Sequence, residues 1–342
     1  MSPDELSSLL SKFERCTIMV IGDVMLDEYL WGHVQRISPE APVPIFNLSH
    51  EEHTLGGAGN VVKNLRSLGA TVIALGAVGA DPIGKSIVGE LDRLGVDREG
   101  VIEDGSRGST RKTRLMSLEH GQQVFRLDKE TAVPVSPATE NALLRTLADK
   151  VGDANAIICS DYMKGVLTPP VLQTAIESAR KRHTPVVVGP KHPDPARYRG
   201  ATYLIPNLRE LEQLSGVRVD GPESIDEAAR LVIGEAEIGS LLVTRGSAGM
   251  SLFERAPGGI RRIDIPTVAR TVYDVTGAGD TVAGVFTLAI AAGASGELAA
   301  RLGTLAAGLV VGKRGTTSVT PSELMQCVHQ QFAADPAFSY SK

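Results

Sequence analysis

The sequence predicts an α/β fold in which helices cover both faces of a mostly parallel sheet, with a small β appendage attached. From residue 136 onward, short apolar runs alternate with segments of helical periodicity, as in parallel strands joined by helices. An earlier apolar run at 17–22 predicts a buried strand. Two segments, about 28–50 and 108–129, contain strand-like pieces that no helix follows directly, and we assign them to an antiparallel appendage.

Local signals define the individual elements. Asp81 with Pro82, Thr168 with Pro169, and Asn207 each provide a helix start, and Gly69 can end a helix over 55–70. The expected helices span 1–16, 55–70, 82–94, 137–150, a segment from 169, 207–216 and 224–236, and two Ala/Gly-rich helices follow 277. The expected strands span 17–22, 28–37, 43–49, 71–79, 110–118, 122–128, 156–162, 184–189, 203–207, 240–246 and 249–254.

Composition limits the class of protein. The chain has 342 residues, 42% of them hydrophobic, and no linker separates independent units, so we expect a single domain over 1–335 and a tail at 336–342. A net charge of −5 gives no electrostatic case for nucleic acid or an anionic membrane as a partner. No apolar run has the length of a membrane span and the N-terminus lacks a signal-peptide pattern, which predicts a soluble, cytoplasmic protein.

Cysteine usage indicates neither a zinc site nor a disulfide framework. Cys16, Cys159 and Cys327 are far apart, and no CxxC spacing occurs. Because Cys159 lies within an apolar strand-like run, we expect it to be a buried, reduced thiol.

The stretch VYDVTGAGDTVAGVF at 272–286 carries the strongest chemical signal. Gly277 and Gly279 permit a tight turn that exposes N–H groups at a helix start, where anions bind well. Asp280 places a carboxylate beside that site and can serve as a general base next to a phosphoryl group. The alternative is an ordinary helix cap with two turn glycines.

A second glycine-rich segment precedes the helix at 55–70. Gly56 and Gly57 allow a polyhydroxyl ligand to lie against the backbone, and Asn60 offers both a donor and an acceptor to hydroxyl groups. Close helix packing would explain the same residues. The segment lacks the GxGxxG spacing after a strand that dinucleotide-binding proteins need, so a nicotinamide-dependent dehydrogenase is poorly supported.

Carboxylates follow the first strand at Asp23 and Asp27. Ligands of parallel α/β sheets bind at the carboxyl ends of strands, so these side chains suit the hydroxyl groups of a sugar. Loop carboxylates that cap a turn are the competing interpretation.

Basic residues gather on the appendage. Lys112 and Arg114 are two positions apart and so share one face of a strand, and with Arg36, Arg126 and Lys164 they can form a cationic pocket for a substrate phosphate. A solvated charged strand face is the alternative.

Two segments suit a nucleotide. Asn207 and Glu210 can form a capping box, and Glu210 can also organise Mg²⁺ through water beside phosphates. Thr244, Arg245 and Gly246 follow an apolar strand and suit a nucleotide phosphate, or else form an ordinary strand exit.

Together these segments resemble the ribokinase-like (PfkB) family of carbohydrate kinases. LGGAGNVVKNLRSLGA is similar to the first family motif and DVTGAGDTVAGVF to the second, while NLRE and VTRG match its nucleotide-side elements in order. The resemblance implies that Asp280 is the catalytic base and that Gly277, Ala278 and Gly279 form an anion hole. It also implies ATP and Mg²⁺ as cofactors, a lid formed by the appendage, and a homodimer joined through lid strands.

Within that family the chain resembles kinases of D-glycero-D-manno-heptose 7-phosphate. ISPEAPVP, QQVFRLD, SDYMKG and VVGKRGTTSVTPSEL carry this likeness, and SDYMKG contributes Asp161 and Lys164 to the expected substrate site. The implied product is the 1,7-bisphosphate used in lipopolysaccharide-core or nucleotide-heptose synthesis. No HxGH motif occurs, so we expect a kinase without a fused nucleotidyltransferase. A kinase of another sugar or sugar phosphate, and a catalytically weakened regulator, are the alternatives.

One position departs from the family pattern. Relatives usually carry Asp-Pro-Lys where this chain has Gly189, Pro190 and Lys191, so a carboxylate near the metal and phosphate region is missing. Lys191 can still contact an ATP phosphate. The resemblance also allows a monovalent cation such as K⁺ near Asp274 and the loop around Gly315.

Overall fold

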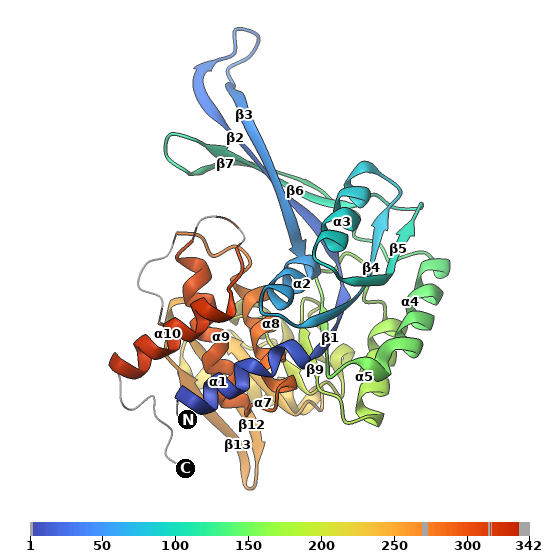
Figure 1. Ribbon diagram of the computed structural model, residues 1–342, viewed down its shortest axis with the longest axis vertical. Coiled ribbons are helices and arrows are strands. Elements are labelled where there is room, and N and C mark those ends of the chain that lie inside the picture. Colours follow the sequence, from blue (N-terminus) through green and yellow to red (C-terminus); the bar gives the residue numbers. More distant parts are fainter. Residues whose placement is uncertain (1–2, 269–272, 314, 316, 335–342) are drawn as a thin grey trace.

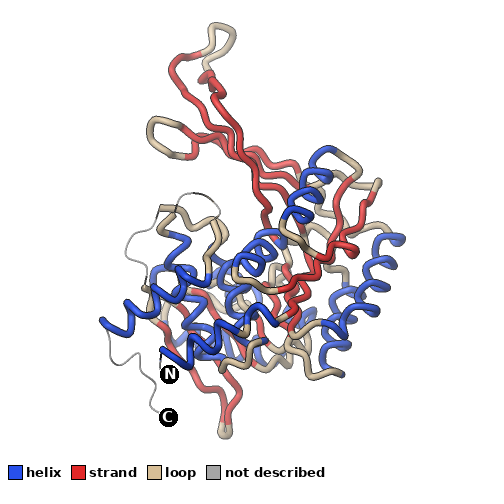
Figure 2. The backbone as a smooth tube through the Cα atoms, viewed as in Figure 1, coloured by secondary structure: helices blue, strands red, loops and turns tan. Residues whose placement is uncertain are grey.

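The structure is a computed structural model that describes residues 3–268, 273–313, 315 and 317–334. Its central strands are β1 (Thr17–Gly22), β4 (Thr71–Gly79), β5 (Asp97–Asp104), β8 (Ala156–Ser160), β9 (Val186–Gly189), β10 (Tyr203–Leu204), β11 (Ser240–Thr244), β12 (Met250–Ala256) and β13 (Gly259–Ile265). Within the described residues they form one sheet in the order β13-β12-β11-β10-β9-β8-β1-β4-β5. The strands of this sheet run through the body of the molecule between the helices (Figures 1 and 2). In this sheet the pairs β11–β12 and β12–β13 run antiparallel, and the other described pairs run parallel.

Helices cover both faces of the central sheet, as the sequence predicts. They are α1 (Pro3–Ser11), α2 (Ala58–Ser67), α3 (Pro82–Arg93), α4 (Pro137–Lys150), α5 (Pro169–Lys181), α6 (Leu208–Ser215), α7 (Pro222–Glu235), α8 (Ala278–Ala291), α9 (Gly296–Val311) and α10 (Pro321–Ala334). Ile18 and Val20 of β1 face a core that includes α2, α8 and α9, whereas Met19 and Ile21 face a second core that includes α4, α5 and α7. The α/β class is therefore confirmed.

A second sheet projects from the body (Figure 1). This outer sheet consists of β2 (Val24–Ile37), β3 (Pro44–Gly57), β6 (Thr110–Ser117) and β7 (Gln123–Lys129), in the order β3-β2-β6-β7. The expectation of a purely antiparallel appendage is wrong, because β2 and β6 run parallel. The β2–β3 hairpin is also longer than the two short pieces predicted, and it reaches farthest from the body.

The helix predicted over 55–70 begins later than expected. Leu55, Gly56 and Gly57 pair with Leu26, Met25 and Val24 and thus end β3. Gly57 has a φ of 56°, a left-handed conformation that glycine adopts easily, and this turn lets the chain pass directly from strand to helix. Strands β5 and β13 were not expected from the sequence.

The structure also describes the cysteines and the length of the helices. Cys16, Cys159 and Cys327 are free thiols, and Cys159 is buried as predicted. Among the described residues, no helix combines the length and the apolar character needed to cross a membrane.

Candidate active site

The start of α8 forms the turn predicted for the TGAG segment. Gly277 has a φ of 79°, again a left-handed conformation, and the amide of Ala278 donates to the carbonyl of Val275 at 3.2 Å. The amides of Gly279 and Asp280 follow in the first helical turn, where no preceding helical carbonyl can accept them. The helix start therefore offers an anion its positive end and the amides of Gly279 and Asp280. The amide of Ala278 is already used within the turn.

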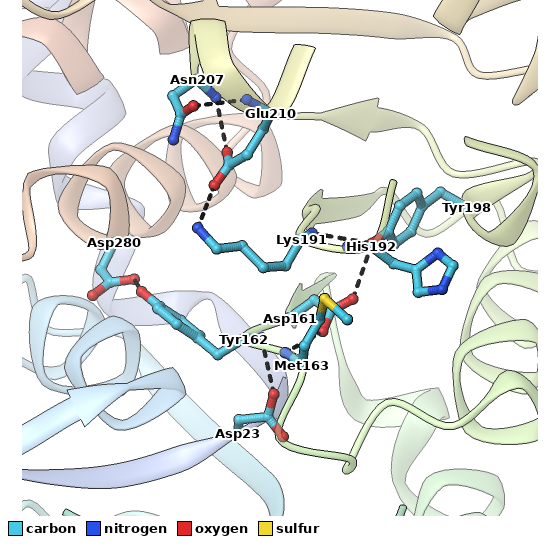
Figure 3. A network of polar contacts seen from close by, with 10 residues as sticks. All are labelled: Asp23, Asp161, Tyr162, Met163, Lys191, His192, Tyr198, Asn207, Glu210 and Asp280. Carbon is cyan, nitrogen blue, oxygen red and sulfur yellow. Dashed lines mark hydrogen bonds and ion pairs between the residues drawn. The ribbon is translucent and has the colours of Figure 1, made fainter. Parts of the chain in front are cut away.

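Asp280 accepts a hydrogen bond at each carboxylate oxygen. Asn60 Nδ2 donates to Oδ2 at 2.9 Å. The hydroxyl of Tyr162 donates to Oδ1 at 2.6 Å (Figure 3). The first contact depends on the packing of α2 against α8, which also joins Thr281 to Asn64 at 3.1 Å.

The surroundings of Asp280 make it suitable as a base near neutral pH. Burial raises the pKa of Asp280 to about 6, while the hydrogen bonds from Tyr162 and Asn60 act in the opposite direction. The charge of Asp27 raises this pKa further, and that of Lys63 lowers it. A carboxylate that titrates close to the working pH is suited to general-base catalysis.

Two cavities meet at this helix start. A polar cavity of about 210 Å³ is lined by Asp161, Tyr162, Lys191, Asn207, Glu210 and Asp280, among others. A mainly apolar cavity of about 300 Å³ is lined by residues that include Met250, Val275, Val282 and Val311. Thr244 and Gly279 contribute to both walls, so the two cavities adjoin.

Of the predicted nucleotide-contacting residues Thr244, Arg245 and Gly246, two line the cavities and one does not. Thr244 lines both cavities and Gly246 lines the apolar one. The guanidinium of Arg245 instead lies against the carbonyl of Met250 at 3.3 Å and the carboxylate of Asp264 at 3.4 Å.

Asp23 anchors the loop that follows β8. Its Oδ2 accepts the amides of Tyr162 at 2.9 Å and Lys164 at 3.0 Å, and its Oδ1 accepts the amide of Val166 at 3.1 Å. Burial raises the pKa of Asp23, and these backbone hydrogen bonds counteract the rise. The geometry fits the competing interpretation of a loop-capping carboxylate.

Asp161 anchors the loop that follows β9. Its Oδ2 accepts the hydroxyl of Tyr198 at 2.9 Å, and that hydroxyl accepts the amides of Lys191 and His192 at 3.1 and 2.9 Å (Figure 3). Asp161 thus fixes the segment after β9 that carries Lys191.

Glu210 combines capping with a cation contact. Asn207 and Glu210 form the predicted capping box, each side chain accepting the other's amide at 2.9 Å. The remaining oxygen, Oε1, accepts the ammonium of Lys191 at 2.7 Å. Because a cationic group already sits on this carboxylate at the cavity wall, the position suits a metal ion held through water. Gly189 nearby faces open space, since an added Cβ would meet no atom within 4 Å.

Asp27 lies in a buried ion pair on the outer sheet. Arg114 Nη1 donates to Asp27 Oδ1 at 2.7 Å. A Cβ on Gly56 would come within 2.5 Å of Asp27 Oδ2, and one on Gly57 within 2.6 Å of the carbonyl of Asp23. The two glycines therefore make room for these aspartates, a reason that the sequence did not indicate.

The predicted cationic cluster is largely paired with carboxylates. Strand register places Lys112 and Arg114 beside Asp128 and Arg126, on one face of the outer sheet. Besides Arg114 with Asp27, the predicted cluster has ion pairs of Lys112 with Asp128 at 3.6 Å and with Glu130 at 3.8 Å, of Arg126 with Asp128 at 3.0 Å, and of Lys164 with Glu130 at 2.9 Å.

The structure does not bring Arg36 to this cluster. It lies four residues beyond Gly32, the last residue of β2 that pairs with β6, near the outer end of the hairpin. The expectation that Arg36 joins the other basic residues is therefore wrong, because the hairpin is longer than predicted.

The expected monovalent-cation site is only partly described. Asp274 Oδ1 accepts the amide of Thr276 at 2.8 Å. The loop around Gly315 includes residues 314 and 316, which lie outside the described residues.

Sequence reasoning missed two residues beside Asp280. Tyr162 lies in the SDYMKG stretch, and nothing in its spacing indicates that its hydroxyl reaches α8. Lys63 lies three positions after Asn60 and so on the same side of the helix, a spacing that could have indicated its place beside Asp280. Its ammonium donates to Thr54 Oγ1 at 3.0 Å.

Comparison with known proteins agrees with this geometry. The model of the pfkB family of carbohydrate kinases matches residues 16–323. The chain is 46% identical over 318 residues to the "Bifunctional protein HldE" of Citrifermentans bemidjiense, covering 92% of this chain and 64% of that relative.

Solved structures show the same fold. Arabidopsis thaliana ribokinase complexed with ribose and ATP has a TM-score of 0.66 at 21% identity, and the match covers 92% of this chain and 98% of that one. Escherichia coli phosphofructokinase-2 in complex with potassium has a TM-score of 0.74 at 18% identity, with the same coverage of 92% and 98%. The family model and the close relative together show that this chain belongs to the pfkB family of carbohydrate kinases.

Proposed function

We propose that this protein is an ATP- and Mg²⁺-dependent kinase that phosphorylates the anomeric hydroxyl of D-glycero-D-manno-heptose 7-phosphate. The observation that carries the proposal is the position of Asp280, which lies in the first turn of α8, where the backbone amides suit an anion, on the wall of a polar cavity. The choice of sugar rests on the sequence resemblance and on close relatives such as the HldE protein of Citrifermentans bemidjiense, of which this chain spans 64%.

Asp280 acts as the general base in this proposal. Its carboxylate accepts the proton of the anomeric hydroxyl while that oxygen forms a bond to the γ-phosphorus of ATP and ADP departs. The amides of Gly279 and Asp280 stabilise the charge on the transferring phosphoryl group. The reaction needs positioning and charge compensation more than covalent catalysis, and the helix start provides both.

The two adjoining cavities divide the nucleotide between them. The apolar cavity suits the base, and the polar cavity beside Thr244, Lys191 and Gly279 suits the phosphates. Glu210 would organise Mg²⁺ through water, and the metal would neutralise phosphate charge when bound. Lys191 would then leave Glu210 and contact a phosphate. A K⁺ site near Asp274 is a further proposal.

The outer sheet acts as a lid over the sugar. Asp27, Lys112, Arg114 and Arg126 share the face that would cover the bound substrate, and Lys164 pairs with the adjacent Glu130. Binding of the sugar 7-phosphate would replace carboxylates around these cations, because a phosphate is a stronger bidentate partner for arginine. Closure of the sheet would exclude water that otherwise hydrolyses ATP.

The opposite face of the outer sheet suits a second copy of the chain. Phe125 and Leu127 are 59% and 54% exposed, and register places them with Leu115 and Leu30 on the face away from Asp27. A homodimer would cover this apolar face and the free strand edges. On this proposal residues 1–335 form one kinase domain that works in the cytoplasm, where ATP is available.

Release of ADP tests the proposal directly. Wild-type protein with ATP and Mg²⁺ should turn over heptose 7-phosphate with a much higher kcat/KM than fructose 6-phosphate or ribose, and ³¹P NMR should show a new phosphate at the anomeric carbon. A preference for another sugar would point to a different member of the family. Sugar-phosphate binding without turnover would point to a regulator.

A further inference from the structure

The phenol of Tyr162 contacts the expected base directly. Its hydroxyl lies 2.6 Å from Asp280 Oδ1, and Figure 3 shows the ring extending from the loop after β8 toward the start of α8. Asn60 occupies the other oxygen, so Asp280 is held between a donor from α2 and a donor from this loop.

The loop that carries Tyr162 is fixed on both sides. Asp23 accepts the amides of Tyr162, Lys164 and Val166, which anchors the backbone from the end of β1. The neighbouring Asp161 accepts the hydroxyl of the buried Tyr198 at 2.9 Å and the amide of Met163 at 2.9 Å. A side chain on such a loop has a defined position before any ligand arrives.

Tyr162 is a donor rather than a second base. Burial, followed by the charge of Asp280, raises the pKa of Tyr162 well above its ordinary value, so the phenol keeps its proton at working pH. Each carboxylate oxygen has two lone pairs. Asp280 can therefore keep both donors and still accept a proton from a sugar hydroxyl.

We propose that Tyr162 is a positioning residue that orients the carboxylate of Asp280 toward the acceptor hydroxyl and favours its ionised form, with Asp23 as the anchor of its loop. This inference rests on the proposed role of Asp280 as base. It gives Asp23 a function that acts through Tyr162 and needs no contact with the sugar.

Two other charged groups also affect the pKa of Asp280, and a test of Tyr162 must leave both of them in place. Lys63 on α2 lowers the pKa of Asp280, and Asp27 on β2 raises it. Tyr162→Phe retains the ring and leaves both charges in place, so it removes only the phenolic hydrogen bond. Tyr203→Phe is a matched control, since Tyr203 is a partly buried tyrosine on β10 whose ring packs against Phe286.

Titration of Asp280 gives a readout that needs no substrate. Protein labelled at the aspartate carboxyl carbon shows one resonance that is lost in Asp280→Asn, and its chemical shift reports the pKa. Tyr162→Phe should raise this pKa by about 1 unit, because a hydrogen bond to a charged acceptor is lost. Tyr203→Phe should leave it unchanged. An unaltered Asp280 titration in Tyr162→Phe overturns the proposal.

Kinetics with the sugar phosphate provide the second arm. At about pH 6, kcat/KM of Tyr162→Phe should be about fivefold below wild type, and the difference should nearly vanish by about pH 8, where Asp280 is ionised in both proteins. A loss of equal size at both pH values would indicate a merely structural role and contradict the proposal. If wild type fails to turn over the sugar, the proposed function fails, while the titration still decides the role of Tyr162.

Asp23→Asn keeps the test decisive if Tyr162→Phe does not fold. This variant weakens the loop anchor and leaves the phenol in place. It should raise the pKa of Asp280, as Tyr162→Phe does. An unchanged pKa of Asp280 would contradict the proposed anchoring by Asp23.

Discussion

Asn60 Nδ2 lies 2.9 Å from Asp280 Oδ2, although 220 positions separate the two residues in the chain. The contact joins the two glycine-rich segments of the sequence. It exists because α2 packs against α8, where Thr281 Oγ1 donates to Asn64 Oδ1 at 3.1 Å. The orientation of the proposed base thus depends on helix packing as well as on its own turn.

The elevated pKa of Asp280 predicts an acidic limit to activity. An aspartate in the unfolded chain titrates near 3.8, whereas burial raises the pKa of Asp280 to about 6. Only the ionised form accepts a proton, so we expect kcat/KM to fall about tenfold per pH unit below pH 6 and to level off above about pH 7. Initial rates of ADP release across this pH range measure the fall in kcat/KM on the acidic side. A flat profile down to about pH 5 would contradict the assignment.

The same shift has a consequence for folding. Because the folded state holds the proton of Asp280 more tightly than the unfolded chain, this group's contribution to the free energy of unfolding falls as pH rises from about 4 to about 6. Ionised Asp280 therefore has a cost in stability, as is common for a functional carboxylate.

Neutralising the basic face of the outer sheet should weaken sugar binding selectively. Lys112→Ala and Arg126→Ala should each raise the KM for the sugar phosphate by about tenfold and leave the KM for ATP nearly unchanged, because each removes a charged partner of the phosphate. Arg36→Ala is the matched control, since Arg36 lies near the outer end of the hairpin. A rise confined to the KM for ATP would show that the basic face was misinterpreted.

Restoring a carboxylate at position 189 should strengthen the metal site. Position 189 faces open space, and a carboxylate there would attract Lys191 away from Glu210. We expect Gly189→Asp to lower the Mg²⁺ concentration for half-maximal rate by about threefold to tenfold. Gly189→Ala controls for the loss of glycine. Identical Mg²⁺ dependence of the two variants would place the metal elsewhere.

Charges on the outer apolar face should abolish the proposed dimer. Phe125→Glu and Leu127→Glu together place two carboxylates on the face expected to meet a second copy, where burying them would be costly. Light scattering after size exclusion should show a dimer for wild type and a monomer for this variant. Leu231→Glu, at an exposed leucine on α7, should remain dimeric. A wild-type monomer, or an unchanged dimer in the double variant, would refute the lid-mediated interface.

Local sequence signals predicted most elements of the central fold. Capping residues identified the starts of α3, α5 and α6, and Asp81, Thr168 and Asn207 each accept the expected backbone amide. Strand β5 was not predicted because five of the eight residues in its sequence, DREGVIED, are charged, and because it forms the edge of the sheet. The length of the β2–β3 hairpin was missed because much of it is exposed and lacks a strong apolar pattern.

Motifs identified the proposed base but not its surroundings. Gly277, Gly279 and Asp280 were recognisable because the turn and the helix start are local features. The contact with Tyr162 and the carboxylates around Lys112 depend on how distant strands and loops meet. Such long-range pairing produces no periodic pattern in a single sequence. For the same reason, the sequence did not indicate that Arg36 lies away from the other basic residues.

The rate of Asp280→Asn tests the central claim most directly. Asparagine keeps the size of the side chain but cannot take up the proton, so kcat for heptose 7-phosphate should fall by roughly 10²–10⁴-fold. The Kd for ATP, measured by calorimetry, should change little. Asp153→Asn, at an exposed position before β8, should behave as wild type in both measurements. Near-normal turnover by Asp280→Asn would contradict the assignment of Asp280 as the catalytic base.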